Sequence, residues 1–272
     1  MNNYEKKEHE AILQWKKAEP SVVDKAVGFI FTPAAWLIEK IVPQKAIEGS
    51  LVAFDKIAEF LTDTTDVVRD GSVGTLEELR SKDLELSDNL ANNVHNWALA
   101  VAGAEGGASG LVGIWGMPVD IPALITMSLR VIHKTGVCYG FEVRTKVDRD
   151  FVFGVLSAAS ANTMKEKATA VTLLQRINVL VAKTTWKKLA EKAAANKYGL
   201  AALIIAIKNL AKQLGINLTK RKVAQAIPVI GAGVGAAVNI AFINDVAWAA
   251  RRMYQERWLI SNKKIGQGAS GE

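Results

Sequence analysis

The sequence AIPVIGAGVGAAVNIAFIND, residues 226–245, lies in a run without charged residues that extends from Val223 to Asn244. A helix that crosses a bilayer needs about 20 consecutive apolar residues. Pro228 is expected to begin the helix, because proline cannot donate the hydrogen bond of an interior helical position. Only residues 229–244, with Asn239 among them, remain for a span. This run is short for a membrane span, and it predicts instead a buried helix that packs against another helix.

A second glycine-rich apolar segment occupies residues 95–142. In both segments glycines recur four residues apart, which places two of them on one helical face and allows another backbone to approach closely. Glycine inside an exposed helix costs about 1 kcal/mol relative to alanine, so this density indicates a compensating close contact. We therefore expect these two helices to cross each other, or a symmetry mate. The glycines concerned are Gly103, Gly106, Gly107, Gly110, Gly231 and Gly235.

Helix punctuation recurs along the chain, whereas strand punctuation is nearly absent. The residues TLEE at 75–78 have the pattern of a capping box, and DIP at 120–122 and IP at 227–228 are typical of helix starts. Residues 51–61 place apolar side chains at steps of three and four, which predicts an amphipathic helix. Its expected apolar face consists of Leu51, Phe54, Ile57, Ala58 and Leu61.

These patterns predict an all-α chain of roughly eight to ten helices, with no or negligible β-sheet. We expect a single compact multi-helix domain over residues 1–262, built around a glycine-rich apolar helical hairpin. Residues 263–272 combine glycine with small polar residues and are expected to form a flexible tail.

Charge is distributed unevenly along the chain, whose net charge is +7. Residues 183–222 carry ten basic residues against one acid, and residues 63–88 carry eight acids against three bases. The basic segment could attract anionic lipid or nucleic acid, or it could be a solubilising helix surface. Trp186 between lysines fits an interfacial helix, and no nucleic-acid-binding motif is present. The residues expected to face a membrane are Lys183, Trp186, Lys187, Lys188, Lys192, Lys220, Arg221 and Lys222.

Three stretches of the sequence resemble the EcsC protein family. They are AEGGASGLVGIWGMPVDIPALITMSLRVIHKTGVCYGFE at 104–142, FVFGVLSAAS at 151–160, and IPVIGAGVGAAVNIAFINDVAWAARRMYQERWL at 227–259. The family takes its name from a bacterial gene that lies beside the genes of an ABC transporter. The resemblance implies a bacterial, cytoplasm-facing and membrane-related role, with a transporter as a possible partner. It supplies no catalytic residue.

Candidates for catalysis and metal binding are weak. Cys138 and His133 are five residues apart, hence about 140° apart around a helix, so they do not form a local nucleophile–base pair. Cys138 is expected to be a small buried hydrophobe. The chain has three histidines, His9, His95 and His133, without the spacing of metal ligands. The glycines at 231–235 lack the lysine and hydroxyl of a phosphate loop. The sequence therefore predicts no metal and no cofactor, and the catalytic residues, if any, stay unknown.

Charged residues inside or beside the apolar segments form the candidate site. A buried charge normally needs a partner. One interpretation is an ion-pair and capping network that fixes how the glycine-rich helices cross. The other is a polar patch at the mouth of an apolar cavity, where arginines meet a lipid phosphate. The candidates are Glu105, Asp120, Arg130, Asp245, Arg251 and Arg252.

The leading functional hypothesis is a non-enzymatic peripheral membrane protein that binds phospholipid or another apolar ligand. The N-terminal sequence lacks the features of a signal peptide, so a cytoplasmic, peripherally membrane-associated location is expected. The alternatives are a soluble helical interaction or regulatory module, and a hydrolase of unrecognised type. Nucleic acid is an improbable partner.

Overall fold

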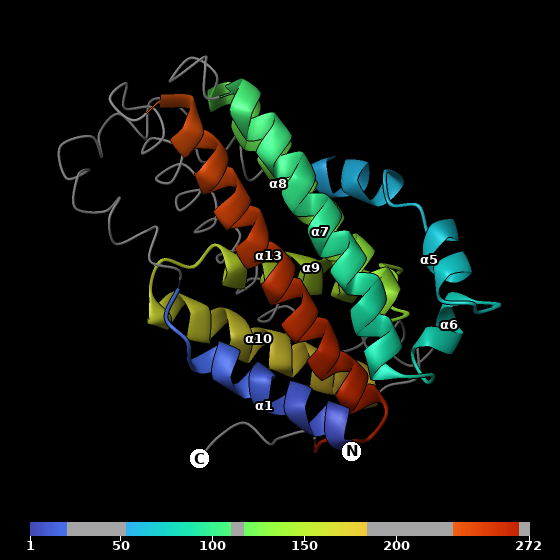
Figure 1. Ribbon diagram of the computed structural model, residues 1–272. Helices are drawn as coiled ribbons and strands as arrows, with labels where there is room; N and C mark the ends of the chain where they lie inside the picture. Colours follow the sequence, from blue (N-terminus) through green and yellow to red (C-terminus); the bar gives the residue numbers. More distant parts are fainter. Residues whose placement is uncertain (21–52, 110–116, 184–230, 267–272) are drawn as a thin grey trace.

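The computed structural model describes residues 1–20, 53–109, 117–183 and 231–266 (Figure 1). These residues form helices and connecting turns and contain no strand, which confirms the all-α fold. Residues 53–60 form a short helix, referred to as the 53–60 helix. The remaining helices are α1 (Asn3–Lys17), α5 (Thr65–Asp70), α6 (Leu76–Leu79), α7 (Leu84–Ser109), α8 (Met117–Cys138), α9 (Lys146–Ala159), α10 (Met164–Lys183) and α13 (Gly231–Ser261).

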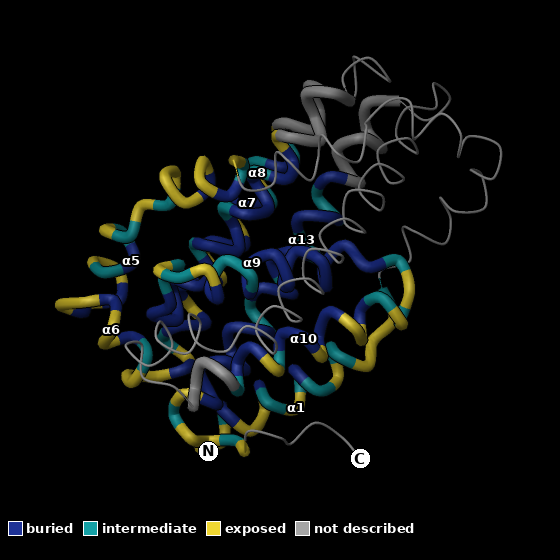
Figure 2. The backbone as a smooth tube through the Cα atoms, turned by 180° about the vertical axis from the view of Figure 1, so that it is seen from behind, coloured by how far each residue is buried: buried dark blue, intermediate teal, exposed yellow. Residues whose placement is uncertain are grey.

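Helix α13 is the central element of the fold. It packs along α7 and also contacts α8, α9, α1 and α10, so helices from both ends of the chain meet on it. Figure 2 shows buried residues along the described part of α13, while exposed residues gather on the outer elements. The largest fully buried side chains include Tyr139, Tyr254, Phe151 and Phe242, which come from α9, α13 and the end of α8.

Gly103 lies where α7 meets α13. A Cβ atom placed on it would come within 3.3 Å of Ile240 Cδ1, tighter than ordinary van der Waals contact. The missing side chain therefore brings the two helices closer together. Gly106 and Gly107 lie in α7, and Gly231 and Gly235 lie in α13. Gly110 lies outside the described residues.

Local sequence signals placed some helix ends correctly and others not. Helix α6 begins directly after Thr75 as predicted, but the predicted capping box does not form. The Glu78 carboxylate instead accepts a 3.1 Å hydrogen bond from the Gly74 amide, because the turn before the helix brings that amide within reach. Helix α8 begins at Met117, three residues before the predicted start at Asp120. Pro228 lies outside the described residues.

The predicted apolar face of residues 51–61 is correct only in part. Ala58 is fully buried and Phe54 packs against the core, as predicted, but Ile57 is 49% exposed and Leu61 is 43% exposed, while Asp55 is fully buried. Residue 51 lies outside the described range. The helix is thus turned so that the Asp55 carboxylate faces the core beside Phe54 and Ala58, while Ile57, Phe60 and Leu61 face outward. The cause of this orientation is the contact of Asp55 with His133 and Arg149.

At the C-terminal end, α13 stops at Ser261, and residues 263–266 of the predicted tail are described. Lys264 Nζ lies 3.2 Å from Glu5 Oε1, and Ile265 packs against the core. Within the described ranges, no helix has both the length and the apolar character required to cross a membrane.

Candidate functional site: a cavity between α5, α7 and α8

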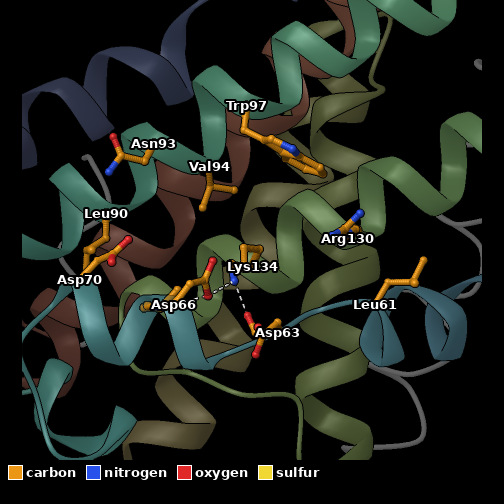
Figure 3. A pocket seen from close by; sticks show the side chains of 11 residues that line it. Leu61, Asp63, Asp66, Asp70, Leu90, Asn93, Val94, Trp97, Arg130 and Lys134 are labelled. Carbon is orange, nitrogen blue, oxygen red and sulfur yellow. Dashed lines mark hydrogen bonds and ion pairs between the residues drawn. The ribbon is translucent and has the colours of Figure 1, made fainter.

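A cavity of about 410 Å³ lies between α5, α7 and α8, next to the end of the 53–60 helix. In the view of Figure 3, Val94 and Trp97 of α7 lie above, Arg130 and Lys134 of α8 lie in the middle, and Asp66 of α5 lies below them. The apolar part of the cavity wall consists of Leu61, Val67, Leu90, Val94 and Trp97. Val67, Leu90 and Val94 are buried, so they form the floor of the cavity, while Leu61 and Trp97 lie at its mouth. Its size falls in the range of small-molecule sites, which is about 300–1,000 Å³.

The acidic side of the cavity is largely neutralised by neighbouring cations. Figure 3 shows Lys134 of α8 between Asp66 and Asp63, where its ammonium group donates to the Asp66 carboxylate and to the Asp63 carbonyl. Asp70 accepts from Arg69 Nε at 2.9 Å. The Asp63 carboxylate accepts a 2.9 Å bond from the Thr65 amide, and such bonds to Thr65 lower the pKa of Asp63. The Asp63 carboxyl is therefore favoured in its ionised form, and the three side chains are held in place by these contacts.

Arg130 provides the cation that stays available for a ligand. Its guanidinium lies over the Trp97 ring, 4.7 Å from the ring centroid, and both residues line the cavity. Across the described residues, no carboxylate lies within ion-pair distance of Arg130. The stacking fixes the guanidinium at the mouth but leaves its five N–H donors without an acid. An anionic group bound here would therefore meet a positioned donor.

Large apolar side chains are exposed beside this mouth. Phe60 is 89% exposed and Trp97 is 40% exposed, next to the outward-facing Ile57 and Leu61 already described. We call these four residues, Ile57, Phe60, Leu61 and Trp97, the apolar edge. Three of them follow one another closely on the 53–61 segment, and Leu61 lines the cavity together with Trp97. Exposed apolar residues that gather in this way are typical of an interaction site.

Asp55 fixes the orientation of the helix that carries most of the apolar edge. Its Oδ1 atom lies 2.7 Å from His133 Nε2 of α8, and its Oδ2 atom accepts a 2.6 Å bond from Arg149 Nε of α9. Asp55 is 0% exposed, and a buried carboxylate needs such charge-assisted partners. Arg149 also reaches Glu59 at 3.4 Å. The helix is thus attached to two neighbours through its polar face.

A smaller cavity of about 240 Å³ is lined by His133, Thr62, Thr64 and the α8–α9 loop. The Asp55–His133 pair resembles the base and orienting acid of a hydrolytic site. The Thr62 hydroxyl, however, donates to the Ala58 carbonyl at 2.7 Å. Throughout the described residues, no hydroxyl or thiol hydrogen-bonds an imidazole, since His95 contacts Asn244 and His133 contacts Asp55.

Cys138 does not supply the missing nucleophile. It is fully buried, and burial raises the pKa of its thiol to about 12. At neutral pH the thiol is protonated, and the thiolate is the reactive form. The interpretation of Cys138 as a small buried hydrophobe therefore agrees with its environment. The described residues also contain no group of three or more histidine, cysteine or acidic side chains able to hold a metal ion.

The other candidate site residues lie away from this cavity. Arg252 Nη1 lies 2.6 Å from Glu8 Oε2, and Arg251 Nη1 donates to Asn92 Oδ1 at 3.1 Å. Because Glu8 lies in α1 and Asn92 in α7, the two arginines join α13 to these helices, and both guanidinium groups also lie over the Trp248 ring of α13. These two arginines thus connect helices, and Arg130 is the candidate arginine at a cavity mouth.

Asp245 lines a third cavity, of about 160 Å³, together with Lys167 and Trp248. Glu105 lies in α7 and Asp120 in the first turn of α8, but the environment of their side chains is not described. Lys183 is the last residue of α10. The other residues expected to face a membrane, Trp186, Lys187, Lys188, Lys192, Lys220, Arg221 and Lys222, lie outside the described residues.

A buried polar cluster around Asp88 was not predicted from the sequence. This carboxylate accepts hydrogen bonds from Tyr4 at 2.8 Å, from Gln255 at 2.7 Å and from Tyr139. It joins α1, α7 and α13 to the turn after α8. Its partners are up to 167 residues away in the sequence, so no local pattern indicates them.

Comparison with known proteins gives a family and one curated relative. The sequence model of the EcsC protein family matches residues 6–259. The chain is similar to the protein named "Uncharacterized protein YdbA" from Bacillus subtilis (strain 168), with 24% identity over 190 residues, which is 70% of this chain. The match covers 64% of the length of that relative. No solved structure matches the chain.

Proposed function

The chain belongs to the EcsC protein family, and on this basis we propose that it is a peripheral membrane protein that binds an amphiphile between α5, α7 and α8. The ligand class is a phospholipid or another molecule with an apolar chain and an anionic headgroup. The observation that carries the proposal is the position of Arg130 at the mouth of an apolar-floored cavity, without a carboxylate partner among the described residues.

The two ends of the cavity suit the two ends of such a ligand. Val67, Leu90 and Val94 offer a dry floor for an aliphatic chain, and each methylene group buried there contributes about 0.8 kcal/mol. Arg130 offers several N–H donors to a phosphate or carboxylate, in the fork geometry that suits these groups. Trp97 contacts both parts, since its ring lines the cavity and supports the guanidinium.

The other functional hypotheses have less support. A hydrolase would need a nucleophile that can pass its proton to His133 or His95, and among the described residues no hydroxyl or thiol is hydrogen-bonded to either imidazole. An interaction or regulatory module would use the apolar edge and would leave the cavity without a ligand. A link to an ABC transporter rests on the family resemblance and stays a prediction.

Binding of a single-chain lysophospholipid to the purified protein tests the proposal. We expect palmitoyl-lysophosphatidylglycerol, used below its micelle concentration, to bind the delipidated protein, and lipid mass spectrometry to find an amphiphile on the protein as first purified. Arg130→Gln should weaken binding by roughly tenfold or more, because a hydrogen bond to a charged group contributes about 1.5–3 kcal/mol. The matched control is Arg176→Gln, since Arg176 is an exposed residue of α10 outside this cavity.

Three results would reject this function. They are a purified protein without any amphiphile, no measurable lysophospholipid binding, and equal binding by the Arg130 and Arg176 variants. If an alkyl alcohol of the same chain length binds as tightly as the lysophospholipid, the apolar floor binds ligand but Arg130 does not select an anionic headgroup.

A further inference from the structure

We propose that the apolar edge, Ile57, Phe60, Leu61 and Trp97, is the surface by which the molecule inserts into the headgroup region of a bilayer. This inference rests on the proposed function, because a peripheral protein that takes up an amphiphile needs a defined face toward the membrane. It adds the residues that make the contact and the orientation that they impose.

The orientation of the 53–60 helix is enforced by its buried charges. Asp55 is held by His133 and Arg149, at 2.7 Å and 2.6 Å. Rotating the helix to bury Phe60 would break both contacts and leave a guanidinium and an imidazole without their acid. Breaking a buried ion pair in this way is strongly destabilising. The outward position of Phe60, which is 89% exposed, is therefore a stable property of the fold.

The composition of the edge suits the interface between water and lipid. Tryptophan is enriched at this interface, and the transfer of phenylalanine, leucine and isoleucine side chains from water into it is favourable. An interfacial surface does not need the length of a membrane span. The absence of a span-length apolar helix in the described ranges is therefore no objection.

Charges around the edge are balanced. Asp66 pairs with Lys134 and Asp70 with Arg69, whereas Asp55 and Glu59 share Arg149. Among the described residues Asp63 has no cation on its carboxylate, and Lys56 and Arg130 have no acid. Five acids thus stand beside five lysines and arginines, so the edge has no negative surplus that would repel an anionic membrane surface.

The edge is continuous with the ligand cavity. Leu61 and Trp97 belong to both, because they line the cavity mouth and are also exposed to solvent. With the edge inserted, the mouth would open at the level of the headgroups. An amphiphile could then move from the bilayer into the cavity without exposing its chain to water. This continuity favours a membrane over a second copy of the chain or a protein partner.

A fluorescent label at position 60 tests the insertion directly. Phe60→Cys carries an environment-sensitive NBD label, and the native Cys138 is fully buried and should not react. With vesicles of phosphatidylcholine and phosphatidylglycerol we expect a blue shift of the emission and quenching by nitroxide-labelled lipid. The same label at Ala168→Cys, an exposed position on α10, should show neither change. Equal responses at both positions, or none at position 60, would overturn the proposal.

A charge placed on the edge gives a second, independent measurement. Phe60→Glu should weaken partition to these vesicles by roughly tenfold, which corresponds to losing much of a buried phenylalanine contribution. Ala168→Glu is the control with the same change of charge. Because Phe60 does not line the cavity, Phe60→Glu should bind lysophospholipid in solution as well as the unchanged protein does.

The two measurements separate this inference from the proposed function. Lysophospholipid binding without vesicle insertion would reject the edge as a membrane surface and keep the cavity as a ligand site. Vesicle insertion without lysophospholipid binding would keep the edge as a membrane surface and reject the cavity as a ligand site. If light scattering shows a dimer that Phe60→Glu dissociates, or if only a protein partner is lost from that variant, the edge is a protein interface and the membrane assignment is wrong.

Discussion

Asp55 and His133 are 78 residues apart in the sequence, and their side chains meet in the interior with 2.7 Å between Asp55 Oδ1 and His133 Nε2. The same carboxylate binds Arg149 of α9, so one acid joins the 53–60 helix to two others. A typical amphipathic helix buries its apolar side chains. In this helix the charged contacts determine which side faces the core.

Replacing Asp55 should therefore destabilise the fold. We expect Asp55→Asn to lower the free energy of unfolding by about 2–4 kcal/mol, somewhat below the range for fully buried pairs because the Arg149 side chain is 28% exposed. Urea denaturation measures this. Asp70→Asn is the control, since the exposed Asp70–Arg69 pair should contribute less than about 1 kcal/mol. Equal destabilisation by both variants would show that the buried pair does not hold the helix.

A second prediction concerns the turn that ends α8. Gly140 has φ of +76°, and the Phe141 and Gly140 amides donate to the carbonyls of Gly136 and Val137 at 2.8 and 2.9 Å. This is the hydrogen-bond pattern of a Schellman motif. A Cβ atom at Gly140 would also lie 2.5 Å from the Leu76 carbonyl oxygen, which belongs to the backbone and cannot rotate away.

Gly140→Ala should thus cost more than the 1–2 kcal/mol of a left-handed residue alone. Thermal unfolding should show a clear decrease in Tm. In Gly74→Ala the added carbon would meet only the flexible Glu78 side chain, at 3.0 Å, so that variant should stay within about 0.5 kcal/mol of the unchanged protein. An unchanged Tm for Gly140→Ala would contradict the geometry of this turn.

Helical punctuation and glycine spacing predicted the all-α fold because both act over a few residues. Thr75 before α6 and Gly103 in α7 are examples of such local signals. The buried face of the 53–60 helix was predicted only in part: Phe54 and Ala58 face the core, but Ile57 does not and Asp55 does. Apolar periodicity reflects transfer free energy and contains no term for distant charged partners. His133 and Arg149 lie 78 and 94 residues beyond Asp55 and reach it only after α8 and α9 have packed.

The candidate site was also predicted only in part, because its contacts too depend on residues that are far apart in the sequence. Arg130 was chosen because a charge within an apolar segment needs an explanation, and it lies at a cavity mouth. Arg251 and Arg252 satisfied the same criterion but join α13 to α7 and α1. Sequence alone does not distinguish these cases, because the distinction depends on whether the folded chain brings an acid to each guanidinium. The acid for Arg252 is Glu8, which is 244 residues away.

The thiol of Cys138 should report on global unfolding. It is fully buried and its pKa is raised to about 12, so both access and ionisation are suppressed. We expect no reaction with Ellman's reagent in native buffer, and a rate that follows the unfolded fraction as urea is added. Phe60→Cys supplies an exposed thiol for comparison and should react at once. Fast reaction of Cys138 in the native protein would indicate local opening near the end of α8.

The last prediction concerns the pH dependence that Asp88 gives to stability. Asp88 is 2% exposed, and burial raises its pKa despite the opposing hydrogen bonds from Tyr139, Tyr4 and Gln255. A carboxyl whose pKa is higher in the folded than in the unfolded state binds its proton more tightly when folded. Its stabilising contribution is complete below the unfolded pKa, about 3.9, and is lost as pH rises through the folded pKa.

Asp88→Asn removes this titration while keeping the size of the side chain. The stability of the variant relative to the unchanged protein should therefore rise from about pH 4 to neutral pH, because over that interval only the unchanged protein must accommodate the buried charge. Urea denaturation across this range measures the difference, and Glu10→Gln, at an exposed position of α1, should show little change. A difference that falls with pH would mean that the three hydrogen-bond donors outweigh desolvation and hold the ionised carboxylate in the folded protein.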